Sequence, residues 1–306
     1  MGKRSKARRR HERRWKEEQM ASITTTSTGT SIMPISDKSL RVERIKDTLE
    51  YPALYLDIYV CGPAFEERAF AEMFARSWCN KVSDPRDADL ILFPGGSDVD
   101  PVLYGEFPHH SVYCDPARDK IDVEVFNIAV EYGIPMFGVC RGAQLGWVMN
   151  GGKLFQDIDN HNGEDHSIWD LTGKTNKFIR PVSSVHHQLV RRDTIPAEDF
   201  LAIAEVAKSQ NRWMDGSNRQ VGLHQDLEVF FLYDTCFLGV QGHPEYPGYN
   251  YFTWWCLSLI EEYIVKSEAT EYNDIGQLRL TPEFMEAREE AWEKAGKVLP
   301  KLPEMS

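Results

Sequence analysis

The chain alternates between short apolar runs and longer segments in which apolar residues recur three and four positions apart. Four runs of four to six residues are mostly apolar and are closely followed by Gly or Pro, which is typical of strands buried on both faces. We expect these strands at residues 55–60, 90–93, 135–139 and 236–241. Helical spacing predicts helices over residues 64–77, 119–132 and 141–150.

This order of strands and helices predicts an α/β fold with a doubly wound, mostly parallel sheet. Right-handed crossovers place the C-terminal ends of parallel strands at one edge, where open α/β sheets bind their ligands. Gly96, Cys140 and His243 each follow one of these strands, so we expect them to meet at that edge. Further strand-like runs at residues 200–207 and 227–233 are expected to extend the sheet.

The segment Gly138-Val-Cys-Arg-Gly142 joins a predicted strand directly to a predicted helix. It has the G-x-C-x-G form of a nucleophile elbow, in which a sharp turn lifts one reactive side chain above the sheet. The two glycines lack Cβ atoms, which permits the strained turn and a close approach of helix to strand. The helix that follows directs its N-terminal amides at the sulfur of Cys140, which favours the thiolate form.

Taken alone, a G-x-C-x-G segment is a weak signal, because a single Cys after a buried strand is more often a small core residue. The strand predicted at 236–241 changes this interpretation, since His243 and Glu245 follow it. A thiol nucleophile needs a base to accept its proton, and the base needs a group to orient it. Cys140, His243 and Glu245 are therefore a candidate catalytic triad.

Two more helices are predicted in the C-terminal part of the chain. Residues 249–264 are rich in aromatic residues at helical spacing, and Thr281-Pro282 is a helix start whose helix should end at Gly296. We therefore divide the chain into a flexible tail (1–50), a catalytic domain (51–266) and a helical extension (267–306).

Composition and cysteine usage indicate a cytoplasmic protein. The six cysteines include no C-x-x-C pair, which argues against a disulfide framework and suits a reducing compartment. The sequence has no apolar run near the roughly 20 residues of a membrane helix. Its charged start lacks the hydrophobic segment of a signal peptide. We expect no contact with membranes.

The net charge of −12 is distributed unevenly. Residues 1–19 contain nine Lys or Arg and three Glu, a local charge of +6, which leaves −18 for residues 20–306 because the two parts sum to −12. The basic segment is either a solvated tail or a contact for an anionic partner. Residues 21–31 are polar and of low complexity, as in a flexible linker.

Several motifs, in the same order along the chain, resemble the class I glutamine amidotransferase-like superfamily. Within it, residues 89–188 and 236–248 are most similar to the branch of γ-glutamyl hydrolases and γ-glutamyl-γ-aminobutyrate hydrolases, the C26 peptidases. The matching segments are Phe93-Pro-Gly-Gly96, Asp100-Pro-Val-Leu-Tyr-Gly-Glu106, Arg118-Asp119, Gly138-Val-Cys-Arg-Gly-Ala-Gln144, Asn150-Gly-Gly-Lys-Leu-Phe-Gln-Asp157, Val182-Ser-Ser-Val-His-His-Gln188 and Val240-Gln-Gly-His-Pro-Glu245.

The resemblance implies a flavodoxin-like, three-layer αβα fold and cysteine-dependent hydrolysis of the γ-glutamyl amide of glutamine or of γ-glutamyl amines and peptides. It assigns Cys140 as nucleophile, His243 as base and Glu245 as the orienting acid. The backbone amides of Gly96 and Arg141 would form the oxyanion hole. The substrate-binding residues that it implies are Gly95, Gln144, Ser184, His186 and His187.

Three alternatives remain beside the hydrolase. The chain could be a glutaminase subunit that supplies ammonia to a separate ligase or synthetase, or a binding scaffold without activity. A metallohydrolase would recruit the histidines near residues 161–187, but no H-E-x-x-H or similar ligand spacing is present, so we expect no metal and no organic cofactor. One departure from the family is Gly242, where an aromatic or bulky residue usually precedes His-Pro-Glu.

Overall fold

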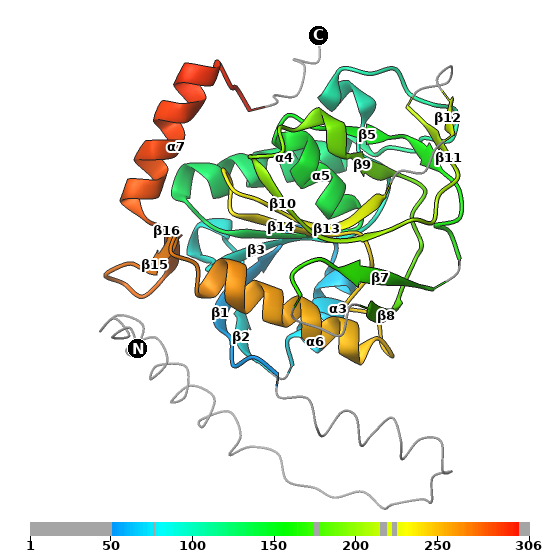
Figure 1. Cartoon of the computed structure of the whole chain (residues 1–306). Coiled ribbons are helices and arrows are strands. Elements are labelled where there is room, and N and C mark those ends of the chain that lie inside the picture. Colours follow the sequence, from blue (N-terminus) through cyan, green and yellow to red (C-terminus); the bar gives the residue numbers. More distant parts are fainter. Residues whose placement is uncertain are drawn as a thin grey trace, which may run out of the picture.

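A computed structural model describes residues 51–75, 77–163, 165–173, 178–214, 219–221 and 225–299. Its centre is one nine-stranded sheet with strand order β2-β1-β3-β4-β14-β13-β10-β7-β8, with helices on both faces (Figure 1). The basic segment 1–19 and the linker 21–31 lie outside the described residues. The three-layer α/β arrangement confirms the predicted fold class.

The first five strands of the sheet are parallel. They are β2 (Trp78–Lys81), β1 (Tyr55–Val60), β3 (Leu90–Phe93), β4 (Met136–Val139) and β14 (Phe237–Val240). All four predicted strands agree with the structure to within one residue at each end, and they are β1, β3, β4 and β14. Strand β2 was missed because its four residues, Trp-Cys-Asn-Lys, have no apolar pattern. This half of the sheet is the parallel, doubly wound unit that the sequence predicts.

The other half of the sheet is antiparallel. It contains β13 (Asp226–Leu232), β10 (Phe200–Val206), β7 (His166–Asp170) and β8 (Phe178–Val182). Strands β10 and β13 are the two predicted extensions. His166 is the first residue of β7.

Smaller pairs of strands surround the main sheet. One pair is β5 (Lys153–Phe155) with β9 (Leu189–Arg191), and another is β15 (Thr270–Tyr272) with β16 (Leu278–Leu280). A third group joins β6 (Asp157–Ile158), β11 (Asn211–Trp213) and β12 (Arg219–Val221). Short 3₁₀ turns cover Pro85–Asp87, Pro101–Tyr104 and Arg192–Thr194.

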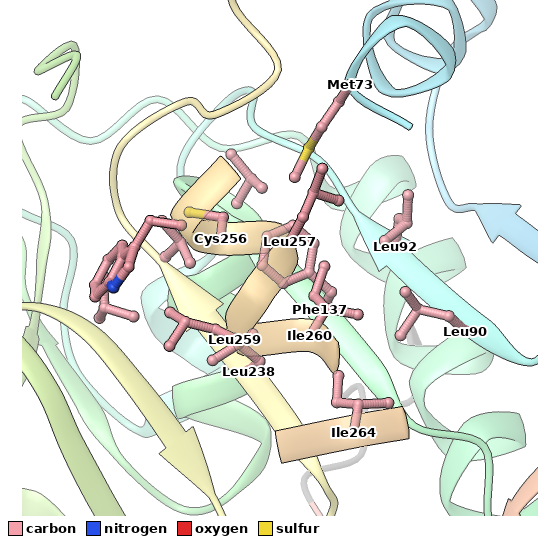
Figure 2. Close-up of a cluster of buried hydrophobic side chains, with 14 of the residues drawn as sticks. Met73, Leu90, Leu92, Phe137, Leu238, Cys256, Leu257, Leu259, Ile260 and Ile264 are labelled. Atoms are coloured by element: carbon pink, nitrogen blue, oxygen red, sulfur yellow. The ribbon is translucent and has the colours of Figure 1, made fainter. Parts of the chain in front are cut away.

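The central strands are apolar throughout because each of their faces contributes to a different core. Leu90, Leu92 and Phe137 belong to one cluster, whereas Ile91 and Phe93 belong to the other. This is the alternation of side chains expected along a strand whose two faces are both covered. Figure 2 shows the first cluster, in which Leu257 and Ile260 pack against these strands.

Of the five α-helices in the described part of the chain, four cover the two faces of the sheet. Helices α3 (Ala64–Met73) and α6 (Asn250–Leu259) pack into the first cluster, and α4 (Pro116–Tyr132) and α5 (Arg141–Met149) into the second. Helix α6 continues as a π-helix over Ile260–Val265, which completes the predicted aromatic helix. The part of the chain that the structure describes contains no helix long and apolar enough to span a membrane.

Helix α4 begins three residues before the predicted start at residue 119. Asp115 is its N-cap, and its carboxylate accepts hydrogen bonds from the backbone amides of Ala117 and Arg118. Pro116 occupies the first helical position, where its missing N–H costs nothing. The cap and the proline together set the start of the helix, a signal that apolar spacing alone does not show.

The segment after residue 266 packs onto the core formed by the main sheet and its helices. Leu278 and Leu280 of β16 are buried in the first core cluster, and the Leu280 amide donates to the carbonyl of Gly133 over 2.7 Å. Helix α7 (Pro282–Ala295) starts at a Thr281 cap and ends at Gly296, as the sequence predicts. The Arg288 guanidinium anchors α7 through a hydrogen bond to the carbonyl of Val130 in α4.

Candidate active site

The turn between β4 and α5 forces Cys140 into a strained conformation. Its φ of 52° and ψ of −112° lie outside the regions that residues with a Cβ normally adopt. The Cys140 amide donates to the carbonyl of Val240 over 2.7 Å, which ties the turn to the end of β14. A Cβ on Gly142 would collide with the carbonyl oxygen of Phe93, so only glycine permits this close packing of α5. Cys140 is the residue immediately before α5, at the positive end of its dipole.

His243 and Glu245 form the second part of the site. The Nδ1 atom of His243 lies 2.7 Å from Oε1 of Glu245, and both side chains are buried. The Tyr246 ring stacks on the imidazole, with 4.4 Å between ring centroids and 12° between planes. The His243 amide donates to Oγ of Ser183 over 2.7 Å. These contacts fix the ring in one orientation.

The electrostatics of His243 favour its protonated form. Burial lowers the pKa of the imidazole, but hydrogen bonds to Cys140 and Glu245, and the charges of those two groups, raise the pKa from 6.5 to about 10. The ring therefore holds a proton at neutral pH and lies hydrogen-bonded between a sulfur and a carboxylate. Such an arrangement supports an imidazolium beside Cys140.

Gly95 lies against both parts of the site. A Cβ at this position would be 2.8 Å from Cε1 of His243 and 3.6 Å from Cβ of Cys140. The ends of β3, β4 and β14 therefore meet, as expected of parallel strands. The structure thus brings Gly95, Cys140, His243 and Glu245 together, although they lie up to 150 residues apart in the sequence.

The backbone of Gly95 and Gly96 is held by Arg118. Its Nη2 donates to the carbonyl of Gly95 over 3.2 Å. Because the carbonyl and the N–H of a trans peptide point in opposite directions, the Gly96 amide is directed away from Arg118. Arg141 is the first residue of α5, so its N–H has no acceptor within the helix. These are the two amides that the sequence analysis assigned to an oxyanion hole, and that role stays a prediction.

A buried network of ion pairs lies next to the turn at Cys140 and joins α5 to α4. The Arg141 guanidinium, which is 1% exposed, pairs with the carboxylates of Asp119 and Asp122 of α4. Arg118 donates to the same Asp122 over 3.3 Å, and the thiol of Cys61 lies 3.1 Å from its other oxygen. Burial, followed by the charge of Asp122, raises the pKa of Cys61 far above its usual value, so this thiol stays protonated. Cys61 is therefore structural.

The four remaining residues predicted to bind substrate lie in different surroundings. Gln144 is buried and donates to the carbonyl of Gln188 over 3.1 Å. Ser184 and His186 are buried beside His161, with the Ser184 hydroxyl donating to the carbonyl of His161 over 2.7 Å. His187 is partly exposed and lies 3.1 Å from both Asp98 and Asp157, whose hydrogen bonds raise the pKa of its ring. No ligand contact bears on these four roles, which stay predictions.

Three features of the site were missed from the sequence. Ser183 fixes the His243 backbone, whereas the sequence analysis named only its neighbour Ser184. Arg118 was recognised as part of a motif without a role. Glu228 of β13 is fully buried beside His161 and His186, yet nothing in the strand Asp-Leu-Glu-Val-Phe-Phe-Leu marks it.

The structure also accounts for the unusual Gly242. A Cβ at this position would lie 2.6 Å from Cγ1 of Val182 and 3.0 Å from Cε1 of Phe252. These side chains occupy the space that a residue with a side chain would need. The glycine therefore does not leave a gap beside His243, which was the concern raised by the sequence.

The sequence is similar to those of several known proteins. The peptidase C26 family model matches residues 86–245. A glutamine amidotransferase-like protein of Lactococcus lactis subsp. cremoris, the YvdE homologue, is 46% identical over 71 residues, 23% of this chain and 38% of that protein. Protein NtpR of Enterococcus hirae is 28% identical over 177 residues, 54% of this chain and 72% of that protein.

A further relative is the γ-glutamyl-γ-aminobutyrate hydrolase PuuD of Escherichia coli K12. It is 41% identical over 71 residues, which cover 23% of this chain and 28% of that enzyme. The chain thus spans less than half of the length of the YvdE homologue and of PuuD. The family model covers just over half of the chain, and its range includes Cys140, His243 and Glu245. The chain therefore belongs to the peptidase C26 family of class I glutamine amidotransferase-like proteins.

Proposed function

We propose that this protein hydrolyses the γ-glutamyl amide bond of glutamine or of γ-glutamyl amines and peptides, with Cys140 as nucleophile. The observation that carries the proposal is the contact between a strained Cys140 at a helix N-terminus and a His243 that Glu245 holds in place. A buried thiol that served only for packing would need neither the strain nor the oriented imidazole. Cys61 provides the contrast, because its partner is a carboxylate that suppresses ionisation.

In the first half of the reaction, the Cys140 sulfur attacks the side-chain amide carbon of the γ-glutamyl group. The new C–S bond forms as the carbonyl π electrons move to oxygen, and the amides of Gly96 and Arg141 stabilise this oxyanion. Loss of one such donor typically costs about 10²–10³ in rate. The protonated His243 then gives its proton to the leaving nitrogen as the C–N bond breaks, which leaves a γ-glutamyl thioester on Cys140.

In the second half, water replaces the amine. Neutral His243 accepts a proton from the water as the water oxygen attacks the thioester carbon. The C–S bond then breaks, glutamate leaves, and the thiolate–imidazolium pair is restored. Glu245 stabilises the imidazolium in both halves, since its carboxylate lies on the ring nitrogen that faces away from the sulfur.

The test is a panel of γ-glutamyl amines, γ-glutamyl peptides and glutamine, with glutamate release as the measurement. We expect turnover by the purified protein and its loss, by about 10³-fold or more, in Cys140→Ala and His243→Ala. Cys61→Ala is the matched control. This substitution removes a thiol that contacts Asp122 of the buried ion network and that touches no reacting atom. Near-normal activity in Cys140→Ala would refute the proposal.

A second candidate is a glutaminase that supplies ammonia to a separate ligase or synthetase, which the naming of the YvdE homologue as amidotransferase-like favours. In that case glutamine would be the preferred substrate, and turnover would rise when a partner is added. A protein that releases no glutamate and whose Cys140 resists a glutamine-like electrophile would be a binding scaffold instead.

A further inference from the structure

A second polar cluster, separate from Cys140, His243 and Glu245, gathers three histidines around Glu228. Glu228 of β13 is 0% exposed, and neither of its carboxylate oxygens has a hydrogen-bond partner among the described residues. Its Oε1 lies 3.4 Å from Nδ1 of His161, 3.5 Å from Nε2 of His166 and 3.8 Å from Nε2 of His186. A buried carboxylate among neutral imidazoles is costly, and a positive charge at the cluster, either a metal ion or an imidazolium, offsets that cost.

The outer nitrogens of two rings already have acceptors. Nε2 of His161 lies 3.0 Å from the Asp226 carboxylate, and Nδ1 of His186 lies 3.0 Å from the carbonyl of Gln188. Each of these nitrogens must carry the proton, which fixes the tautomer of the neutral ring. The opposite nitrogens, which face Glu228, then present lone pairs. The Ser184 hydroxyl lies 3.4 Å from Nδ1 of His161, but its shorter hydrogen bond, of 2.7 Å, is to the His161 carbonyl.

Two lone pairs and a carboxylate directed at one another repel unless a cation lies between them. Metal-binding histidines show this same pattern, in which the second nitrogen donates to a carboxylate or a backbone carbonyl. Asp226 is itself fixed by Arg212 and by the Ser209 hydroxyl and amide. The Asp226 carboxylate that holds the His161 ring is thus itself held in place by hydrogen bonds.

We propose that His161, His186 and Glu228 bind a divalent transition-metal ion such as zinc. The donor atoms of these three residues all lie within 4.8 Å of one another. Two ligands at the usual zinc distances and a tetrahedral angle are about 3.3 Å apart, close to the 3.4 Å and 3.8 Å found between Glu228 and the two histidines. Nε2 of His166 also lies 3.5 Å from Oε1 of Glu228. This site contrasts with the expectation of no metal, which rested on sequence spacing alone.

The ion would be structural and would hold the segments that place His243. The loop at His161 and the loop at His186 are joined through a 3.1 Å hydrogen bond between the His186 amide and the His161 carbonyl. Ser183, whose hydroxyl oxygen accepts a hydrogen bond from the His243 amide, is three residues from His186. The Glu228 carbonyl accepts from the amide of Gln241, two residues before His243. The metal would thus link β13 and both loops to the active-site strand.

The test measures metal content by mass spectrometry on protein purified without metal-affinity resin. We expect about one equivalent of zinc per chain in the native protein, and a loss of at least ~5-fold in Glu228→Gln and His186→Ala. His187→Ala is the matched control, since this adjacent histidine contacts Asp98 and Asp157 rather than the cluster. Cys140→Ser must also retain the metal, which excludes binding at the proposed nucleophile.

A second measurement does not depend on whether the variants fold. Native protein unfolded in chelator and refolded with zinc in 100-fold excess over its dissociation constant should melt about 5 °C or more above protein refolded without it. Refolding with Co²⁺ should give the intense visible absorption of a tetrahedral site. Substoichiometric metal together with no effect of zinc on melting would refute the proposal and indicate a buried imidazolium–carboxylate pair. Neither readout requires hydrolase activity, so this result and a failure of the proposed function are distinguishable.

Discussion

Replacement of Gly95 by alanine tests whether the contact between Cys140 and His243 carries the reaction. The added methyl group would lie 2.8 Å from Cε1 of His243, although carbon atoms normally stay about 3.5–4.0 Å apart. The imidazole would therefore move by roughly 1 Å. Because the ring is held by Glu245 at 2.7 Å and by the stacked Tyr246, this movement must break its alignment with the carboxylate or with the sulfur.

The expected effect on catalysis is large. A misplacement of about 1 Å typically costs about 10²-fold in rate, which corresponds to ~2.7 kcal/mol of transition-state stabilisation. We expect kcat/KM for a γ-glutamyl substrate to fall by this factor in Gly95→Ala. Overpacking of this kind destabilises a fold by about 1–3 kcal/mol, so the variant should remain folded at 25 °C.

Gly152→Ala serves as the comparison. Its methyl group would collide with the Trp147 indole beyond the end of α5, remote from the reacting atoms. It should lower the melting temperature at least as much as Gly95→Ala and leave the kcat/KM of the folded protein unchanged. If Gly95→Ala is folded and keeps kcat/KM within about threefold of the native protein, the alignment of Cys140 and His243 is not what limits the reaction.

Three further predictions follow from the same geometry. Glu245→Gln removes a charge that raises the pKa of His243. Because the imidazolium exists below its pKa of about 10 and is lost above it, the basic limb of the pH profile of kcat/KM should move to lower pH. A basic limb that does not move would argue against His243 as the proton donor. Arg118→Ala removes the hydrogen bond to the Gly95 carbonyl, which holds the same peptide group as the Gly96 amide. We expect kcat to fall by about 10-fold or more with little change in KM. Steady-state kinetics that show an effect on KM alone would contradict this. Phe237→Ala removes a buried ring that packs against Gly138 and Gly146. Denaturant titrations should show a fall of about 3–5 kcal/mol in the free energy of unfolding. A loss below ~1 kcal/mol would show that the turn at Cys140 does not depend on this ring.

The local features of this protein were predictable from the sequence because their causes are local. The apolar runs of β3 and β4 and the Thr281 cap of α7 can be recognised within a few residues, and the structure agrees with them closely. The Gly-x-Cys-x-Gly segment can also be recognised locally, although the contacts that require its glycines are with Phe93 and Phe237, which lie far along the chain. The meeting of Cys140 with His243 followed from one general rule, that parallel strands end at a common edge.

The tertiary structure decided which side chains from distant segments face one another. Arg118 reaches the carbonyl of Gly95, 23 residues away, and Asp226 reaches His161, 65 residues away. Glu228 lies in a strand whose alternation fits a core, and His186 lies in a motif that resembles a substrate loop, so no local pattern predicts that they share a buried cluster. The path of the antiparallel strands brings them together, and the pairing of strands depends on the whole chain rather than on any short stretch of it.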